Sequence, residues 1–294
     1  EILIEATKGK YAVGAFNVTN IIQMEGVLEA ASNKNSPLII QTSVSPSQFI
    51  GPRVFSAVYR ELAASVEIPV TLHLDHCTDV EYCKTCVDAG YTNIMIDGSA
   101  YAYEENVRQT KEVCEYAHKN GIASVEGELG TVSGVEDQVI VAENEAELCD
   151  PEMAVRFVEE TGVDIFAPAI GTAHGIYKVR NPKLDFNRLE KVYKNLNGES
   201  VKVPVVIHGG TGLQPEVVRR LVALGGSKFN VSTELKHTWI DGVTQYLNDH
   251  NGEYNPGNVD KHARAATMRA VEAWIDLLGS AGGAGNKAAS GGTQ

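Results

Sequence analysis

The sequence predicts a single α/β domain of the (β/α)8, or TIM-barrel, class. Eight short runs rich in β-branched and apolar residues recur along the 294 residues, and longer segments with helical spacing of apolar residues separate them. Because parallel strands need helical crossovers, eight such units are expected to close into a barrel. A doubly wound open sheet, the alternative, would usually have fewer strands and a glycine-rich phosphate turn, which "AFNVTN" after the first strand does not provide.

The predicted elements alternate regularly along the chain. The predicted strands are residues 11–18, 36–43, 69–76, 92–99, 122–130, 163–175, 203–212 and 227–234. The predicted helices include residues 21–35, 79–90, 104–121, 150–162, 185–196 and 214–226, several of which end on glycine as helix C-termini often do. We expect the barrel domain to span residues 1–279. Residues 280–294, "SAGGAGNKAASGGTQ", have no apolar face to bury and are expected to form a flexible tail.

Composition excludes several classes of partner. The formal net charge of −13 disfavours a nucleic-acid surface and requires any anionic substrate to be held locally. No apolar run approaches the roughly 20 residues that span a bilayer, so no membrane partner is expected. The cysteines are odd in number, five, and no apolar leader is recognised, which predicts a reducing cytoplasm and no disulfide framework.

Polar side chains gather at the ends of the predicted strands, which is where barrel enzymes hold their active sites. They are Asn17, Asp75, His76, Asp97, Ser99, Glu126, Glu128, His174, His208, Asn230, Ser232 and Thr233. Three of them are histidines that follow the third, sixth and seventh strands, so a barrel brings them to one rim. Three imidazoles with an open fourth position form a catalytic zinc site. A hydrogen-bonded rim role suits any one of these histidines but suits all three less well.

Other potential ligands are interpreted as structural. His73 lies three residues before His76, so strand alternation is expected to turn it to the opposite face, where it would be a hydrogen-bonded structural histidine. Cys77, Cys83 and Cys86 flank a helix start and lack a second matching pair. We interpret them as buried or inert thiols rather than as a zinc cluster.

Glycine-rich segments follow the last two histidines of the rim. They are "GTAHG" at residues 171–175 and "HGGTG" at 208–212, and "NVST" at 230–233 ends the last strand. Glycine lets backbone N–H groups approach a ligand closely, and the loops after the last two strands are the usual phosphate site of a barrel. Tight turns alone would also explain glycines. Beside three potential metal ligands, a small phosphorylated substrate is the favoured interpretation.

Several motifs occur together in one order along the chain. They are "GAFNVTN", "LHLDH", "MIDGS", "EGELG", "GVEDQ", "IGTAHGIYK", "HGGTG" and "NVSTEL". In these motifs the chain, from about Gly9 to Gly279, resembles the class II, zinc-dependent ketose-bisphosphate aldolases, which include fructose-1,6-bisphosphate and tagatose-1,6-bisphosphate aldolases. The resemblance implies a lyase of carbohydrate metabolism, such as glycolysis, and a homodimer or homotetramer.

The resemblance implies roles for particular residues. The expected zinc ligands are His76, His174 and His208. Asp75 matches the carboxylate that moves the proton of the substrate's C4 hydroxyl, and Glu136 matches the mobile-loop acid that moves the proton at C3. Asp97 and Glu128 match the carboxylates of a secondary cation position near the zinc. A Lewis acid on the substrate oxygens would stabilise the carbanion left when the C3–C4 bond breaks.

Further matches concern the substrate. The expected substrate-binding residues are Asn17, Ser43, Gly175, Lys178, Gly209, Gly210, Thr211, Asn230, Ser232, Thr233 and Arg264. Most match the family's cradle for dihydroxyacetone phosphate, where a monovalent cation, Na+ or K+, commonly helps. Arg264 matches an arginine that reaches a neighbouring subunit's site. Lys178 is also a potential Schiff-base nucleophile, but a metal site makes that role unnecessary, so a phosphate or rim charge is favoured.

Two departures from the family's pattern bear on the substrate. Ala100 stands where the family often has histidine, and Ser232 stands where many fructose-specific members carry aspartate, which favours a tagatose-type or relaxed specificity. A class II aldolase acting on another ketose 1-phosphate is an alternative. A zinc hydrolase is another, although its usual His-x-His on the first strand is absent. A non-enzymatic sugar-phosphate sensor is the third, and it would not need Asp75 and Glu136.

Overall fold

Eight parallel strands close into a barrel, which confirms the predicted fold class. The structure, a computed structural model, describes residues 1–122, 124–136, 139–142, 146–177 and 182–285, without the side chains of residues 135–141. Around the barrel the strands follow the order β1, β10, β9, β8, β5, β4, β3, β2. Their bounds are β1 (Val13–Asn17), β2 (Leu38–Thr42), β3 (Val70–Cys77), β4 (Asn93–Ile96), β5 (Ser124–Leu129), β8 (Ile165–Pro168), β9 (Val205–Ile207) and β10 (Gly226–Val231). This closure excludes the doubly wound open sheet.

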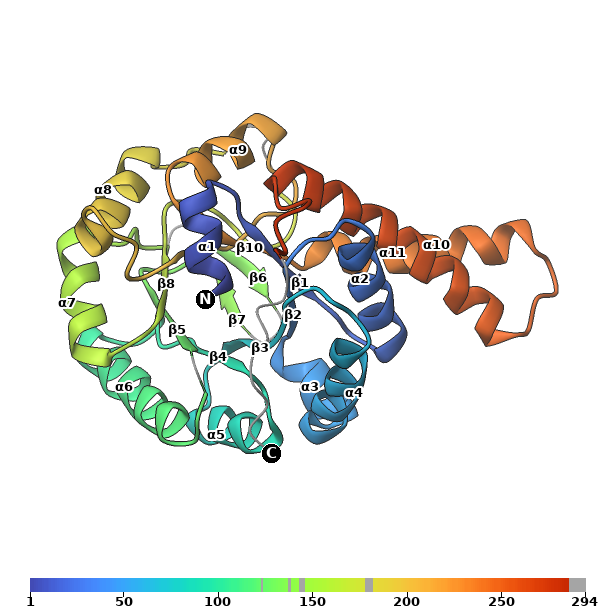
Figure 1. Ribbon diagram of the computed structural model, residues 1–294, viewed down its shortest axis with the longest axis horizontal. Helices are drawn as coiled ribbons and strands as arrows, with labels where there is room; N and C mark the ends of the chain where they lie inside the picture. The colour runs from blue at the N-terminus through green and yellow to red at the C-terminus, as the bar shows by residue number, and fades with distance from the viewer. Residues whose placement is uncertain (123, 137–138, 143–145, 178–181, 286–294) are drawn as a thin grey trace.

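Most of the helices surround the barrel as an outer ring (Figure 1). In chain order the helices of the described residues are α1 (Ile2–Gly9), α2 (Ile21–Asn33), α3 (Val44–Ile50), α4 (Pro52–Ala64), α5 (Val80–Ala89), α6 (Tyr103–Lys119), α7 (Pro151–Thr161), α8 (Phe186–Asn197), α9 (Pro215–Ala223), α10 (Thr233–Asp249) and α11 (Pro256–Leu278). The six helices predicted from spacing correspond to α2 and to α5 through α9. Because the crossovers are helical, every barrel strand ends at the same rim.

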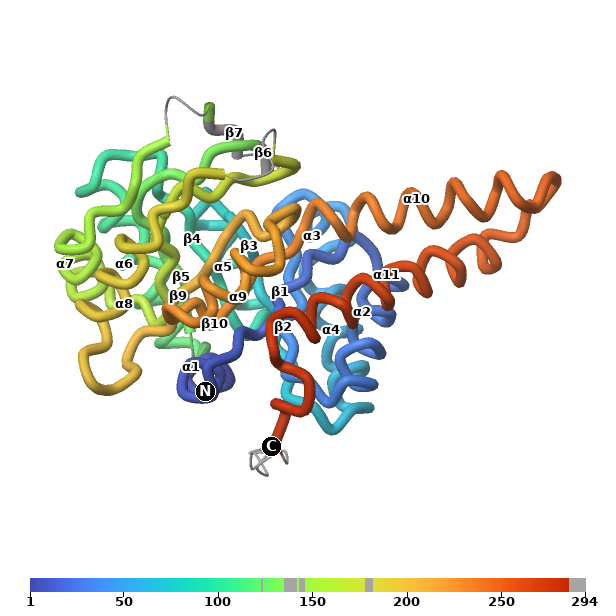
Figure 2. The backbone as a smooth tube through the Cα atoms, turned by 90° about the horizontal axis from the view of Figure 1, so that it is seen from above, coloured from blue at the N-terminus to red at the C-terminus, as the bar shows by residue number. Residues whose placement is uncertain are grey.

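Different elements lie at the two ends of the barrel (Figure 2). At the amino ends of the strands, α1 buries Leu3 and Ala6 against an apolar layer inside the barrel. That layer consists of Val13, Ala15, Ile39, Ile165, Ala167 and Val206. At the other end stands a hairpin of β6 (Gly134–Glu136) and β7 (Val139–Val141), which the strand pattern did not predict. The sealed end leaves the carboxyl rim as the accessible mouth of the barrel.

The C-terminal part of α10 and the N-terminal part of α11 form an arm that extends away from the barrel (Figures 1 and 2). Two of the apolar side chains on or beside it, Ile240 and Tyr254, are exposed. The homodimer or homotetramer stays a prediction. No helix in the described part of the chain is both long and apolar enough to cross a bilayer.

The end of the described chain packs against α2. The backbone N–H groups of Gly282 and Ala284 donate to the carbonyl oxygens of Lys34 and Asn35 at 2.9 and 3.0 Å, and Ser280 is buried. Residues 280–285 of the expected tail therefore have fixed partners. Residues 286–294 lie outside the described residues, and the division at residue 279 stays a prediction.

All five cysteines are buried free thiols, as expected for Cys77, Cys83 and Cys86. Elsewhere in the core, α7 packs on the barrel through Phe157, whose ring lies 5.9 Å from that of Phe166 on β8. A Cβ on Gly127 of β5 would stand 3.0 Å from the same Phe157 ring, so the helix sits close to the sheet because this strand position has no side chain.

We predict that Phe157→Ala destabilises the protein by about 3–5 kcal/mol, because the ring is fully buried and the surrounding barrel cannot collapse into the cavity. Phe157→Leu fills most of the same volume and serves as the matched control, with a much smaller loss. Chemical denaturation of the variants measures both values. An alanine variant that loses less than about 1 kcal/mol would show that the site relaxes.

Candidate active site

Three histidines from separate strand ends meet at the carboxyl rim. His76 lies near the end of β3, His174 in the loop after β8, and His208 directly after β9. The ring centroids of His76 lie 4.6 Å from His174 and 4.5 Å from His208. One nitrogen of each ring lies within 4.8 Å of one nitrogen of the others, and all three side chains are buried. The arrangement fits the donor set of one zinc ion.

An irregularity in β3 aims His76 at this site. Its backbone φ is 47°, and the pairing register with β4 shifts between Leu74 and Cys77. Without this change, strict alternation would point His76 away from Asp75. A β3 residue in the left-handed region is strained, and such strain persists where the surrounding structure over-determines it. Two consecutive side chains therefore enter the site.

The same irregularity overturns one expectation. His73 was expected on the face opposite His76, but it also faces the barrel interior, where its Nε2 lies 3.8 Å from Glu126 and 3.9 Å from Asp75. Alternation places the side chains of residues 73 and 75 on the interior face of the strand. The bend at residue 76 turns the His76 side chain to that same face. His73 is fully buried and hydrogen-bonded to Asn93.

A carboxylate stands behind each of two ligand candidates. His76 Nδ1 lies 2.8 Å from Asp97 Oδ2, and Ser99 donates to the other Asp97 oxygen from its hydroxyl (2.6 Å) and its backbone (3.1 Å). His208 Nε2 lies 2.9 Å from Glu126 Oε1. The remaining nitrogens, His76 Nε2 and His208 Nδ1, face each other at 2.7 Å. Metal-binding histidines characteristically donate their other N–H to such a carboxylate, so these facing nitrogens are the ones placed to bind a metal.

The site carries an excess of negative charge. Burial lowers the pKa of His76, but Asp75, Asp97 and Glu128 together outweigh it and raise that pKa to about 10. Burial and the nearby Asp97 raise the pKa of Glu128 well above its usual range. Within the described residues, Glu128 Oε2 is buried without a hydrogen-bond partner. His76, Asp97 and Glu128 also form a group that could hold a metal. The site therefore favours a cation.

Three amides hold the carboxylate of Asp75. Asn17 Nδ2 donates to Oδ2 at 2.9 Å, Gln41 Nε2 to the same oxygen at 3.3 Å, and Asn230 Nδ2 to Oδ1 at 3.1 Å. All four side chains are buried. Gln41 was not among the predicted site residues, although its place two residues after the inward-facing Ile39 on β2 marks it as an interior side chain. The carboxylate is oriented before any substrate arrives.

A small pocket opens beside these groups. Its lining consists of Asn17, Asp75, His76, His174, Gly175, Gly209, Gly210, Thr211, Asn230, Ser232 and Thr233, all of them predicted site residues. Gly209 has a φ of 68°, and a Cβ there would stand 2.4 Å from the carbonyl oxygen of Ala173. The hydroxyl of Tyr177 accepts from Ala173 N (3.0 Å) and donates to Gly209 O (2.8 Å), which joins the two histidine-bearing loops.

Other predicted residues lie elsewhere or are not described. Ser43 is buried at the start of α3 and does not line the pocket. Arg264 on α11 pairs with Glu29 and lies 4.0 Å from Glu25, both on α2. The backbone of Glu136 belongs to β6, but its side chain lies outside the described part, as does all of Lys178. Their functional roles stay predictions.

Comparison with known proteins identifies the family. The sequence profile described as "Fructose-bisphosphate aldolase class-II" matches residues 1–283. The fructose-bisphosphate aldolase of Geobacillus stearothermophilus is 40% identical over 288 residues, which cover 96% of each chain. That of Staphylococcus aureus strain Mu50 is 37% identical over 285 residues, 95% of this chain and 96% of the relative. The crystal structure of the YdjI aldolase from Escherichia coli K12 is 31% identical, with a TM-score of 0.82, and covers 96% of this chain and 98% of that chain.

The barrel and its buried histidines are typical of a (β/α)8 enzyme with a group that could hold a metal at the carboxyl rim. The chain belongs to the class II fructose-bisphosphate aldolase family. It is therefore a class II aldolase, a carbon–carbon lyase, and the hydrolase and the non-enzymatic sensor are set aside. Members of this family act on sugar phosphates and use a divalent metal, and the three-histidine group fits that requirement.

We predict that zinc binding near neutral pH releases protons. The pKa of His76 lies at about 10, above its ordinary 6.5, so the metal-free protein keeps that proton at neutral pH and zinc must displace it. Zinc affinity should therefore rise with pH between about 6 and 9. Calorimetry in buffers of different ionisation enthalpy measures the release, with His76→Gln as the control. A binding heat that does not depend on the buffer would contradict this assignment.

Proposed function

We propose that the protein catalyses the reversible cleavage of a ketose 1,6-bisphosphate, tagatose- or fructose-1,6-bisphosphate, into dihydroxyacetone phosphate and glyceraldehyde 3-phosphate. Family membership supports the reaction. The observation that carries the proposal is the oriented carboxylate of Asp75 beside the three histidines, within a glycine-lined pocket. A cytoplasmic location and a place in carbohydrate metabolism such as glycolysis are part of the same proposal.

The proposed metal is Zn2+, held by His76, His174 and His208. Imidazole nitrogens suit zinc, and their mutual distances allow one ion to bind all three. When bound, zinc supplies a Lewis acid that takes up negative charge developing on the substrate's oxygens as the C3–C4 bond breaks. Asp97 and Glu128, with His76, are the proposed secondary cation position. The Oε2 of Glu128, which has no hydrogen-bond partner within the described residues, supports it.

Asp75 is the proposed base for the C4 hydroxyl. A general base must reach the proton within hydrogen-bond distance, and Asp75 both lines the pocket and stands next to His76 in sequence. Glu136 is the proposed acid for the proton at C3. Its hairpin is anchored beside the site, because His174 N donates to Ser133 O at 2.7 Å and a Cβ on Gly134 would stand 2.3 Å from His174 O.

The phosphate of the dihydroxyacetone half is proposed to bind between the glycine loops and the start of α10. Gly175, Gly209 and Gly210 expose backbone along the pocket, and Thr211 adds a hydroxyl. Ser232 and Thr233 line the pocket at the N-terminus of α10, a 17-residue helix whose dipole favours an anion there. Lys178, Ser43 and Arg264 complete the proposed substrate set, together with a monovalent cation, Na+ or K+.

We propose that the site discriminates only weakly between the two C4 epimers of the substrate. The relatives from G. stearothermophilus and S. aureus are named as fructose-bisphosphate aldolases, which supports the fructose epimer. At residue 232 the pocket is lined by the hydroxyl of a serine instead of a carboxylate, which supports the tagatose epimer or acceptance of both epimers. A hydroxyl can donate or accept a hydrogen bond, whereas a carboxylate only accepts.

We predict that Asp75→Asn lowers kcat by about 10²–10⁴-fold, because the amide keeps the shape but cannot take the hydroxyl proton. Asp79→Asn is the matched control. Asp79 caps α5 through Glu81 N and Tyr82 N, and asparagine caps a helix equally well, so kcat should not change. Steady-state kinetics with zinc content measured in parallel test both variants. Unchanged turnover in zinc-loaded Asp75→Asn would remove the proposed base.

We further predict that the zinc-loaded enzyme cleaves both bisphosphates, with kcat/KM values within about tenfold, or about 1.4 kcal/mol, of each other. Ser232→Asp should shift the ratio toward fructose-1,6-bisphosphate, because it introduces the carboxylate that the family resemblance implies for many fructose-specific members at this position. Chelation should abolish both activities. If neither bisphosphate is cleaved, the substrate is another ketose 1-phosphate, and a panel of aldehydes with dihydroxyacetone phosphate in the synthetic direction identifies it.

A further inference from the structure

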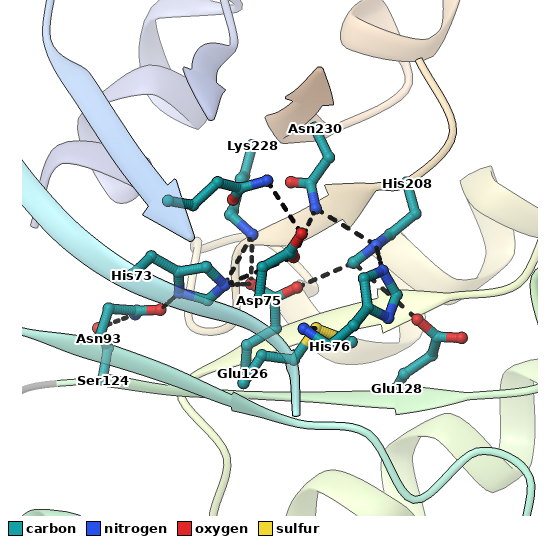
Figure 3. A network of polar contacts seen from close by, with 12 residues as sticks. His73, Asp75, His76, Asn93, Ser124, Glu126, Glu128, His208, Lys228 and Asn230 are labelled. Atoms are coloured by element: carbon teal, nitrogen blue, oxygen red, sulfur yellow. Dashed lines mark hydrogen bonds and ion pairs between the residues drawn. The ribbon is translucent and has the colours of Figure 1, made fainter. Parts of the chain in front are cut away.

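A layer of ionisable side chains lies inside the barrel directly beneath the site (Figure 3). Its members are His73 on β3, Glu126 on β5 and Lys228 on β10, all with 1% or less of their surface exposed. Each precedes a residue of the site by two positions on the same strand: His73 before Asp75, Glu126 before Glu128, and Lys228 before Asn230. Strand alternation therefore puts this layer one step deeper than the site.

Lys228 sets the direction of the hydrogen bonds in this layer. Its Nζ lies 2.7 Å from Glu126 Oε2 and 3.3 Å from His73 Nε2. An ammonium group only donates, so His73 Nε2 must accept, and the proton of that ring lies on Nδ1, which faces Asn93 Oδ1. Burial, and next the positive charge of Lys228, hold the pKa of His73 well below its usual range, in agreement with a neutral ring.

The second oxygen of Glu126 reaches the metal ligand. Glu126 Oε1 lies 2.9 Å from His208 Nε2, and a carboxylate paired with lysine only accepts. The ring proton of His208 therefore lies on Nε2. This leaves the lone pair of Nδ1 directed at the metal position, where His76 Nε2 lies 2.7 Å away. One lysine thus determines the tautomer of a ligand that it does not contact.

Stability alone does not account for this pair. Desolvating two charges costs so much that well-packed apolar side chains in their place are often as stable or more so. The next layer toward α1 is filled by apolar side chains such as Ile39, Ile165 and Val206. The charged pair occurs at the level from which Glu126 can reach His208. Its position thus favours a functional role.

We propose that Lys228 and Glu126 are positioning residues for His208: they fix its proton on Nε2 and present Nδ1 to the metal. The inference deepens the proposed function and rests on a metal bound by the three histidines. Neither residue touches the substrate pocket as described, so their effect is on metal affinity and not on the reacting atoms.

The test is the double variant Glu126→Gln/Lys228→Met. It removes both charges together, since loss of one alone would leave the other buried and unpaired. The glutamine keeps the size of Glu126, but its amide can turn either oxygen or nitrogen to His208, so it no longer selects one tautomer. We expect zinc to bind about 10–100-fold more weakly in a chelator competition. The exposed pair of α8 provides the matched control, Glu190→Gln/Lys194→Met, which should bind zinc like the wild type.

A second measurement tests the tautomer of His208 without substituting Glu126 or Lys228. NMR of the zinc-loaded wild-type protein with nitrogen-labelled histidine, assigned with His208→Gln, should show His208 protonated at Nε2 and metal-bound through Nδ1. The opposite tautomer would overturn the proposal, even if the double variant does not fold. A folded double variant with wild-type zinc affinity would overturn it as well. If the wild type itself binds no zinc at the histidines, the proposed metal site fails, which is distinguishable from failure of the positioning role.

Discussion

Inside a closed barrel, every second side chain of each strand faces other side chains instead of water, so any charge there must be paired within the protein. The interior near the rim holds four buried carboxylates, those of Asp75, Asp97, Glu126 and Glu128. Among the described residues, Lys228 is the one buried lysine or arginine near them, and His76, whose pKa is raised to about 10, adds a second positive charge while no metal is bound. Amides and hydroxyls satisfy part of the remainder. The negative charge left over accounts for a site that attracts a cation.

The bend in β3 determines where the carboxylate of Asp75 lies relative to the imidazole of His76. The φ of 47° at His76 puts a proposed metal ligand and the oriented carboxylate of Asp75 side by side in the sequence and in the site. Backbone in a sparsely populated region costs on the order of 1–3 kcal/mol. Pairing of β3 with both β2 and β4 supplies the restraint that holds it. A base and a ligand contributed by one rigid strand need no loop movement to reach their relative positions.

The sequence predicted the rim better than the interior. The three histidines were found because a residue's place at the rim depends only on where strands end, and strand ends are marked by turn residues. Lys228 and Gln41 were missed because they lie within strands, where only the direction of the side chain separates barrel interior from helix-facing core. The error over His73 has the same origin. Alternation correctly groups it with Asp75, but the bend that brings His76 to that face leaves no mark in the sequence.

The arrangement also suits the doubly phosphorylated sugar of the proposed function, although the protein is acidic. The carboxylates lie on β3, β4 and β5 or directly after them, whereas the lining residues Thr211, Ser232 and Thr233 follow β9 and β10 and are uncharged. Under the proposed function, phosphate meets backbone N–H groups and hydroxyls on one side, and the reacting carbon atoms meet acids and metal on the other. A carboxylate at residue 232 would bring negative charge to the phosphate side and repel the phosphate. Only stricter discrimination between the C4 epimers of the sugar would compensate for that repulsion. Serine avoids that repulsion, and under the same proposal relaxed C4 specificity is the expected consequence.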